Sequence, residues 1–279
     1  PDLPVDNLLV EPEGRDTAAA VAWASLEVAK RYGEDVVIGF FPADHWIGDV
    51  KAFANTLGSA VELAQTQQAI VTLGITPTFP STGYGYIQQG TPSGEYQQLK
   101  TYQVDRFTEK PDADKAKSFI DSGDYTWNSG MFIFTAKTVI QELHLHAPEI
   151  MKLLCEHGVS CYPTLPKQSV DYALMEKTQL THVIPADFGW DDLGDWNAIE
   201  RLLKGEDINV ELAEHIGLDT QGAILYASNP EEVVVTIGLE DVVIVRDGHV
   251  TLIAAKHRTQ EIKQVLSKIK ENPKFDRLL

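Results

Sequence analysis

Apolar and polar positions alternate along the first part of the chain in a pattern that predicts helices and strands in turn. Between Asp16 and Tyr32 the apolar residues recur at helical spacing, which predicts an amphipathic helix. Residues 36–41 (VVIGFF) and 69–75 (AIVTLGI) are continuous apolar runs, as expected for buried parallel strands, and a helical pattern lies between them at about 48–67. This order predicts a parallel sheet with helices on its faces, where ligands bind beyond the carboxyl ends of the strands.

The middle of the chain continues the alternation. Strand-like segments with polar or glycine-rich tips lie at 83–90, 103–111 and 127–135, and a further strand is expected at 181–186. Helical patterns lie at about 113–122, 136–146, 148–157 and 169–177. The predicted fold class is therefore α/β.

After about residue 204 the pattern changes to short β runs, at 223–227, 232–238, 241–248 and 249–255. The dipeptide Asp247-Gly248 between the last two runs is typical of a hairpin turn. A helical pattern from Arg258 to about Glu271 follows. We therefore expect two domains, an α/β domain over residues 1–204 and a small β-rich domain with a terminal helix over residues 205–279.

The composition of the chain indicates which kinds of partner and which cellular location to expect. With 279 residues, of which 43% are apolar, the chain can bury a full core, and its net charge of −18 argues against binding a nucleic-acid backbone. No apolar run approaches the ~20 residues needed to cross a bilayer, and the start lacks the pattern of a signal peptide. The chain has only two cysteines, Cys155 and Cys161, which suits a reducing compartment better than a disulfide scaffold. A cytoplasmic location is therefore expected. The absence of an initial Met suggests trimming.

The segment 188–196 (FGWDDLGDW) places two adjacent carboxylates, Asp191 and Asp192, between two tryptophans and close to two glycines. Such packing holds a carboxylate rigidly, as a divalent cation or a sugar hydroxyl requires. The alternative is a helix start in which Asp191 or Asp192 is the cap. The segment alone does not separate these two interpretations.

Further polar residues lie at the ends of the expected strands. Asp44 follows the first apolar run, where it can hold a metal ion or a ribose hydroxyl, or cap the next helix. Glu109 and Lys110 are consecutive, so both side chains could reach one ligand only at the end of a strand. There they would provide an acceptor for hydroxyl groups beside a cation for phosphate. The alternative is a solvated surface pair. Asn128 can both donate and accept, and Arg15 stands at a helix start with free N–H groups.

Other chemistries find little support. His144 and His146 are two positions apart on an expected helix and diverge, and the two cysteines lack the spacing of a zinc site. No serine or cysteine lies in a nucleophile motif. In-line displacement at phosphorus needs no protein nucleophile, only cations and positioning, and the residues at the strand ends suit it.

The ordered segments EPEGRDTA, FFPADHWI, GITPTFPSTGYGYI, RFTEKP, WNSGMFIF, SVDYALMEK and FGWDDLGDW resemble the mannose-1-phosphate guanylyltransferases of the sugar nucleotidyltransferase superfamily. The resemblance covers nearly the whole chain. It implies a Rossmann-like nucleotidyltransferase sheet with helices on both faces, followed by a C-terminal β region and helix. It also implies that mannose 1-phosphate attacks GTP to form GDP-mannose and pyrophosphate, with Mg²⁺ on the phosphates.

The resemblance implies a role for each matching residue. Asp44 and Asp192 would hold the metal, with Asp44 also near the ribose, and Asp44, Lys110 and Asp192 would be the catalytic residues. The substrate-binding residues would be Glu109 and Asn128 on mannose hydroxyls, Gly85 close to the sugar, and Glu11, Arg15, Thr17 and Ala18 around the guanine. Lys110 would contact the sugar phosphate. Aligning W-x-D-x-G makes Asp192, and not Asp191, the ligand.

One departure affects the nucleotide. The glycine-rich loop that cradles the triphosphate in such enzymes has no counterpart, since the chain contains no Gly-Gly and starts near the family's third strand. We therefore expect either a longer natural protein or a degenerate relative. The alternatives to GDP-mannose synthesis are a transferase for another hexose 1-phosphate or base, and a non-catalytic sugar-nucleotide-binding or regulatory homologue. The β region could support a homodimer.

Overall fold

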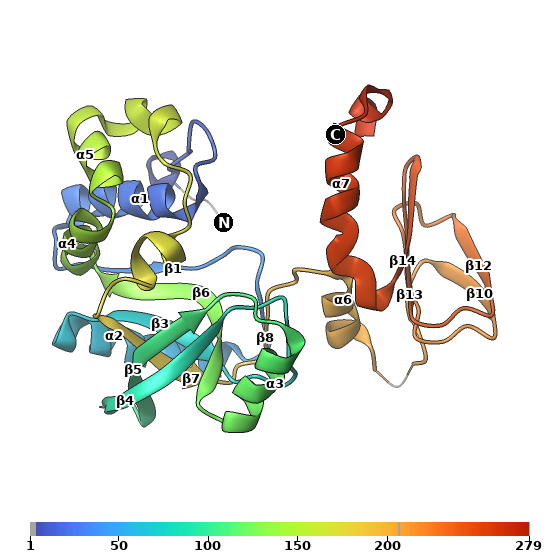
Figure 1. Ribbon diagram of the computed structural model, residues 1–279, viewed down its shortest axis with the longest axis horizontal. Helices are drawn as coiled ribbons and strands as arrows, with labels where there is room; N and C mark the ends of the chain where they lie inside the picture. Colours follow the sequence, from blue (N-terminus) through green and yellow to red (C-terminus); the bar gives the residue numbers. More distant parts are fainter. Residues whose placement is uncertain (1–3, 206, 279) are drawn as a thin grey trace. The chain divides into compact units, whose positions relative to one another are not determined.

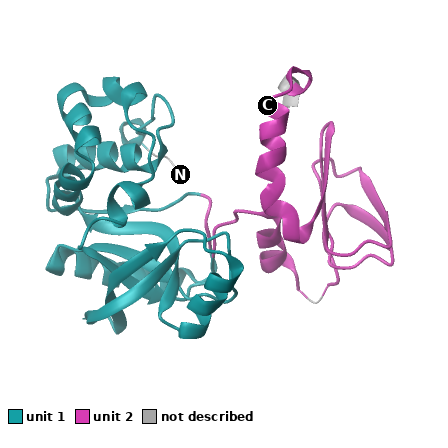
Figure 2. Ribbon diagram, viewed as in Figure 1, with its two compact units in different colours: residues 1–43, 47–190 teal, residues 44–46, 191–279 magenta. Residues whose placement is uncertain are grey.

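The computed structural model describes residues 4–205 and 207–278 of the chain. Two compact units divide it (Figure 2): unit 1 comprises residues 1–43 and 47–190, and unit 2 comprises residues 44–46 and 191–279. The chain thus passes from one unit to the other three times. In the described part of the chain, no helix combines the length and the apolar character needed to cross a membrane.

Unit 1 is built on a six-stranded mixed sheet (Figure 1). Its strands, in spatial order, are β1 (Val37–Phe40), β6 (Tyr125–Thr135), β3 (Ile70–Ile75), β7 (Thr181–Ala186), β5 (Leu99–Thr108) and β4 (Tyr86–Tyr96). Strands β3 and β7 are parallel, whereas β6 runs antiparallel to β1, β3 and β4. The central strand β3 is buried along its whole length, because helices cover both faces of the sheet.

Helices α1 (Asp16–Tyr32), α4 (Ala136–His146) and α5 (Pro148–His157) pack on one face, and α2 (Val50–Gln67) and α3 (Ala113–Ser122) on the other (Figure 1). Each face has its own apolar core. The α1 core contains the small residues Ala18, Ala19 and Ala22, which are fully buried and let the helix approach its neighbours closely. The predicted arrangement of a sheet with helices on both faces is confirmed.

Strand β1 corrects one expectation. The run at 36–41 was expected to be a parallel strand, but β1 pairs antiparallel with β6 and lies at one end of the strand order. Ile38 contributes to one core and Val37 packs against the other. A continuous apolar run therefore reports burial on both faces, which says nothing about the direction of the neighbouring strand.

The segment 169–177 also differs from the regular helix expected there. It contains a single π-helical turn, Asp171–Met175, in which the amide of Glu176 donates to the carbonyl of Asp171 over 2.9 Å. Such a turn inserts one extra residue and changes the direction of the side chains around it. A 3₁₀ turn, Gly158–Thr164, precedes this segment, and a short one, Val5–Asn7, lies before α1.

In its described residues, unit 2 consists of short strands, two α-helices and two 3₁₀ segments. Its elements are α6 (Trp196–Leu203), β9 (Val210–Leu212), β10 (Glu214–Leu218), β11 (Ile224–Ala227), β12 (Val233–Ile237), β13 (Val242–Asp247), β14 (Val250–Ala255) and α7 (Ile262–Lys270). Strand β11 lies parallel to both β9 and β13, and β10 lies parallel to β12. The expected hairpin joins β13 and β14 in antiparallel register, and Gly248 takes a φ of +50° in its turn.

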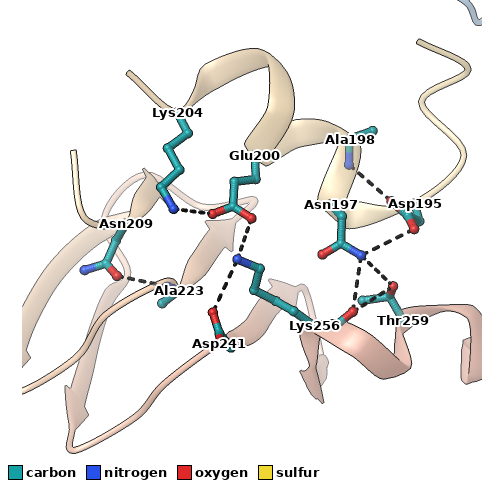
Figure 3. Close-up of polar contacts among 10 residues, drawn as sticks. All are labelled: Asp195, Asn197, Ala198, Glu200, Lys204, Asn209, Ala223, Asp241, Lys256 and Thr259. Atoms are coloured by element: carbon teal, nitrogen blue, oxygen red, sulfur yellow. Dashed lines mark hydrogen bonds and ion pairs between the residues drawn. The ribbon is translucent and has the colours of Figure 1, made fainter. Parts of the chain in front are cut away.

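The N-cap of helix α6 is Asp195, which differs from both residues that the sequence offered as a cap. Asp195 accepts a hydrogen bond from the amide of Ala198 over 3.1 Å, so neither Asp191 nor Asp192 is the N-cap. The side chain of Asn197 then donates to the carbonyl of Lys256 over 3.2 Å (Figure 3). The cap and this contact attach the start of α6 to the segment that follows β14.

A second polar contact joins the middle of α6 to the same segment. The ammonium group of Lys256 is paired with the carboxylate of Glu200 and lies 3.6 Å from Asp241 (Figure 3). Lys204 pairs with the other oxygen of Glu200 over 2.6 Å. The pKa of Glu200 is lowered, since hydrogen bonds and charge from the two lysines outweigh its partial burial. Within unit 2, α6 is therefore held to the β-rich part by charge as well as by packing.

Candidate functional site

Glu109 and Lys110 lie directly beyond the end of β5. The Lys110 ammonium is 2.9 Å from a carboxylate oxygen of Glu109, and the Lys110 and Glu109 side chains are 59% and 60% exposed. Lys110 has a φ of +40°, so the extended backbone has ended there and the two consecutive side chains reach the same side. An acceptor and a cation thus stand together in an accessible position, as a sugar phosphate requires.

Gly85 lies next to this pair. A Cβ at Gly85 would stand 2.9 Å from a carboxylate oxygen of Glu109 and 3.5 Å from the Cβ of Asn128. The carbonyl of Gly85 accepts a hydrogen bond of 2.8 Å from the amide of Asn128. The structure therefore brings Gly85, Glu109 and Asn128 together from three separate parts of unit 1.

The side-chain amide of Asn128 is held at both ends. Its Oδ1 accepts from the amide of Gly130 over 3.0 Å, and its Nδ2 donates to Oδ1 of Asp171 over 2.8 Å. Gly130 has a φ of +69°, a conformation that glycine adopts without strain. Asp171 was given no role from the sequence, although it lies in the motif SVDYALMEK.

Asp171 also shares the electrostatic environment of this cluster. Burial raises the pKa of its carboxyl group, the hydrogen bond from Asn128 opposes that rise, and the charges of Glu109 and Asp16 add to it. The pKa of Glu176 is raised for similar reasons, first burial and then the charges of Asp171 and Glu109. Glu109, Asp171 and Glu176 therefore lie close enough to one another to oppose each other's ionisation.

The four residues that the resemblance places around guanine lie at or just before the start of α1. The hydroxyl of Tyr162 donates to Glu11, and the guanidinium of Arg15 donates to the carbonyl of Pro163. Burial, followed by the bond to Glu11 and its charge, raises the pKa of Tyr162 strongly. Glu11 and Arg15 are thus engaged by the 3₁₀ turn Gly158–Thr164 of the same unit.

The start of α1 corrects the expectation of free backbone donors. The amide of Ala18 donates to the carbonyl of Gln168 over 3.1 Å, and the amide of Thr17 donates to the side chain of Asp16 over 2.8 Å. In addition, the hydroxyl of Thr17 accepts from the amide of Val170 over 2.8 Å. The protein itself therefore uses both N–H groups, that of Thr17 on the neighbouring Asp16 side chain and that of Ala18 on Gln168, in a segment that runs beside the helix start.

The two carboxylates expected to hold a metal, Asp44 and Asp192, both belong to unit 2. Both act on the imidazole of His45: burial lowers its pKa, while the negative charges of Asp44, Asp192 and Asp191 oppose that change. Asp44 and Asp192 therefore approach one histidine from two distant parts of the sequence.

Asp192 is held in a tight turn. Its Oδ1 accepts from the amide of Gly194 over 2.9 Å, and a Cβ at Gly194 would lie only 2.7 Å from its Oδ2. Leu193 between them has a φ of +51°. The glycine is thus needed for Asp192 to keep this position, which explains the D-x-G spacing in physical terms.

Asp191, the neighbouring carboxylate, has a different environment. It is 7% exposed and forms a two-point ion pair with Arg201 of α6, with Nε 2.6 Å from Oδ2 and Nη2 3.1 Å from Oδ1. Its Oδ1 also accepts from the amide of Leu193 over 3.0 Å. Asp191 is therefore committed to contacts within unit 2, and Asp192 is the more accessible of the two.

Asp44 and Asp192 supply carboxylate oxygens, the kind of donor that Mg²⁺ prefers. Mg²⁺ is commonly held by one or two carboxylates together with substrate phosphates and water. Among the residues that the structure describes, no group of three or more His, Cys, Asp or Glu side chains converges on a common point.

Comparison with known proteins places the chain in a family. The model of the nucleotidyl transferase family matches residues 5–206, and that of a MannoseP isomerase/GMP-like beta-helix domain matches residues 213–269. A mannose-1-phosphate guanylyltransferase of Escherichia coli K12 is 35% identical over 97% of this chain and 59% of its own length. The xanthan biosynthesis protein XanB of Xanthomonas campestris is 37% identical over 94% of this chain and 57% of its own length.

Solved structures agree with these matches. A Thermus thermophilus protein described as a mannose-1-phosphate geranyltransferase has a TM-score of 0.83 at 34% identity, covering 94% of this chain and 78% of that one. A mannose-6-phosphate isomerase from Helicobacter pylori has a TM-score of 0.56 at 32% identity, covering 65% of this chain and 72% of that one. The chain spans a little under three fifths of the length of the curated relatives, 59% for the Escherichia coli protein. The predicted family and fold class are confirmed, and the chain belongs to the nucleotidyl transferase family.

Proposed function

We propose that the protein transfers a guanylyl group from GTP to mannose 1-phosphate, giving GDP-mannose and pyrophosphate. The names of the relatives support this substrate pair, and the cluster at the end of β5 supports it in chemical terms. The single observation that carries the proposal is the meeting of Gly85, Glu109 and Asn128 beside Lys110. This cluster supplies acceptors and donors for hydroxyl groups, space for a sugar ring, and a cation for its phosphate.

The reaction proposed for this site is one in-line displacement. A phosphate oxygen of mannose 1-phosphate forms a new bond to the α-phosphorus of GTP, and the bond from that phosphorus to the pyrophosphate oxygen breaks. Lys110 would bind the sugar phosphate and hold its attacking oxygen in place, while Glu109 and Asn128 would fix the hexose through its hydroxyls. No covalent intermediate with the protein is required, in keeping with the absence of a nucleophile motif.

We assign the metal-binding role to Asp44 and Asp192. Mg²⁺ bound there would neutralise charge on the nucleotide phosphates during the displacement. The turn formed by Asp192 and Gly194 supports this role, because it holds one carboxylate in a fixed position. Asp191 is left out of the site, since its ion pair with Arg201 already satisfies it.

Glu11, Arg15, Thr17 and Ala18 are proposed to surround the guanine base. Their position at the start of one helix supports a common role. The amides of Thr17 and Ala18 are already bonded, and the side chains of Glu11 and Arg15 each use one polar atom within the protein. The polar contacts to the base would therefore come from the remaining polar atoms of those two side chains and from backbone carbonyls.

The experiment is a product assay with the whole gene product. It is incubated with Mg²⁺, GTP and mannose 1-phosphate, and GDP-mannose and pyrophosphate are quantified by chromatography. Parallel reactions replace GTP with ATP or UTP, and mannose 1-phosphate with glucose 1-phosphate. Fastest turnover of the first pair supports the proposal. Faster turnover of another pair would reassign the substrate, and tight GDP-mannose binding without turnover would identify a regulatory homologue.

We also propose that the chain forms a homodimer through its β-rich region. Five aliphatic side chains, Ile216, Leu218, Val233, Val235 and Ile237, share one face of the paired strands β10 and β12 and are 46% to 69% exposed. An apolar face of this kind marks an interaction surface, and a second copy offers a matching one. Sedimentation velocity should show a dimer that Val235→Lys dissociates; a monomeric wild type would contradict the proposal.

We also propose a cytoplasmic location for the protein, with neither nucleic acid nor a membrane as a partner. Both cysteines are free thiols, Cys155 exposed and Cys161 buried, which supports a reducing location such as the cytoplasm. The net charge of −18 argues against nucleic acid as a partner, and we propose none. Membrane association is not proposed either. Fractionation of cells producing the whole gene product would test the location.

A further inference from the structure

The amide of Asn128 has one defined orientation. Exchange of its oxygen and nitrogen would place an N–H group against the amide N–H of Gly130 and an oxygen against the Asp171 carboxylate. Both contacts would then be repulsive, so the network selects the observed orientation. One N–H of Nδ2 is used by Asp171, and within the described residues no second acceptor is seen, so the other N–H is left for a ligand.

The position of Asp171 depends on the π-helical turn. Its carbonyl accepts from the amide of Glu176 over 2.9 Å, five residues later. Such turns are rare and recur at functional sites, because the inserted residue redirects a side chain at a cost in stability. Here the turn begins at the residue whose carboxylate meets the Asn128 amide of strand β6.

The electrostatic environment of Asp171 argues against a purely stabilising role. Burial raises the pKa of its carboxyl group, and neighbouring Glu109 and Asp16 raise it further, so the charged form is disfavoured in the fold. The hydrogen bond from Asn128 is the largest of the contributions that favour the charged form. Because this environment disfavours the charged form, the Asp171 carboxylate is better explained by its hydrogen bond to the Asn128 amide than by a contribution to stability.

We propose that Asp171 is a positioning residue of the sugar-phosphate site, which fixes the Asn128 amide so that its remaining N–H is presented to a hexose hydroxyl. The inference rests on the proposed function for the identity of the sugar. The orientation of the amide can be tested without any ligand. Asp171 itself is not assigned a contact with the substrate.

The test is a double-mutant cycle read by calorimetric titration of mannose 1-phosphate into the whole gene product. Asp171→Ala should weaken binding by about tenfold, the effect of a typical hydrogen bond. Asp171→Asn should retain most of the affinity, since its amide oxygen can accept the same bond. In an Asn128→Ala background, Asp171→Ala should cause no further loss. Glu176→Gln is the control, because Glu176 shares the raised pKa but no hydrogen bond to Asn128 is observed.

A second measurement keeps the two proposals separable. The side-chain amide signals of Asn128 are followed by nuclear magnetic resonance without ligand, and Asp171→Ala should shift them and speed their hydrogen exchange. Unchanged signals, or equal losses of affinity in the wild-type and Asn128→Ala backgrounds, would overturn the positioning role. If the wild type binds no hexose 1-phosphate, the proposed function fails, and the amide signals alone decide the role of Asp171.

Discussion

Replacing Gly85 with alanine tests whether the residues at the end of β5 form a sugar site. The added Cβ would stand 2.9 Å from a Glu109 carboxylate oxygen, whereas ordinary contacts begin at 3.4 Å. The carboxylate must therefore move by about half an ångström or rotate away. Because the Glu109 side chain is 60% exposed, it can do so at little cost. We expect the free energy of unfolding to change by less than about 0.5 kcal/mol.

The binding of mannose 1-phosphate should change far more. A hydrogen bond from a hydroxyl to a charged carboxylate contributes about 1.5–3 kcal/mol, so its loss weakens affinity by roughly 10- to 150-fold. Calorimetric titration measures the affinity, and urea denaturation measures the stability. Gly205→Ala is the matched control, since its Cβ would meet nothing within 4 Å. Unchanged affinity in Gly85→Ala would refute the assignment of Glu109 to the sugar.

Three further predictions concern stability. Arg201→Met should lower the free energy of unfolding by about 3 kcal/mol, because it leaves Asp191 buried without its partner, and adding Asp191→Asn should restore part of the loss; urea denaturation that shows no loss would contradict this. Asp195→Ala should cost about 1 kcal/mol by removing the α6 cap, as measured by thermal denaturation, and an unchanged melting temperature would contradict this. The folded state raises the pKa of Asp171 above its ordinary value of 3.8, so the contribution of Asp171 to stability should fall as pH rises through the interval between its unfolded and folded pKa values. Asp171→Asn should therefore be the more stable protein at neutral pH and lose that advantage below the interval, and a constant difference across pH would contradict the burial argument.

The elements that were predicted well have strong local signals. Helices α1, α3, α4 and α5 were expected within a residue or so of their observed bounds, because helical periodicity coincides with caps such as Asp112 and Thr135. The hairpin of β13 and β14 follows from its Asp-Gly turn. Strands β9 and β10 were missed, since they are short and largely exposed and so lack an apolar run.

The candidate site was predictable only in part. The positions of Asp44, Glu109 and Asn128 at strand ends indicated that they are candidate site residues. The specific role expected for each came from the resemblance to the family. The partner of Asp191 could not be found from the sequence, because Arg201 lies ten residues away on a helix and pairs with it only after the chain turns. Asp171 was missed for a related reason: its side chain meets Asn128, 43 residues earlier, through a π-helical turn that periodicity does not reveal.

We propose that this protein makes GDP-mannose with a metal held by Asp192. The most direct measurement is the rate of GDP-mannose formation by the whole gene product carrying Asp192→Asn, compared with Asp187→Asn, an exposed aspartate five residues earlier. We predict that Asp192→Asn lowers turnover by about 100-fold or more, since a fixed charge at the reacting phosphates is lost, while Asp187→Asn leaves it unchanged. Wild-type turnover in Asp192→Asn would contradict the account.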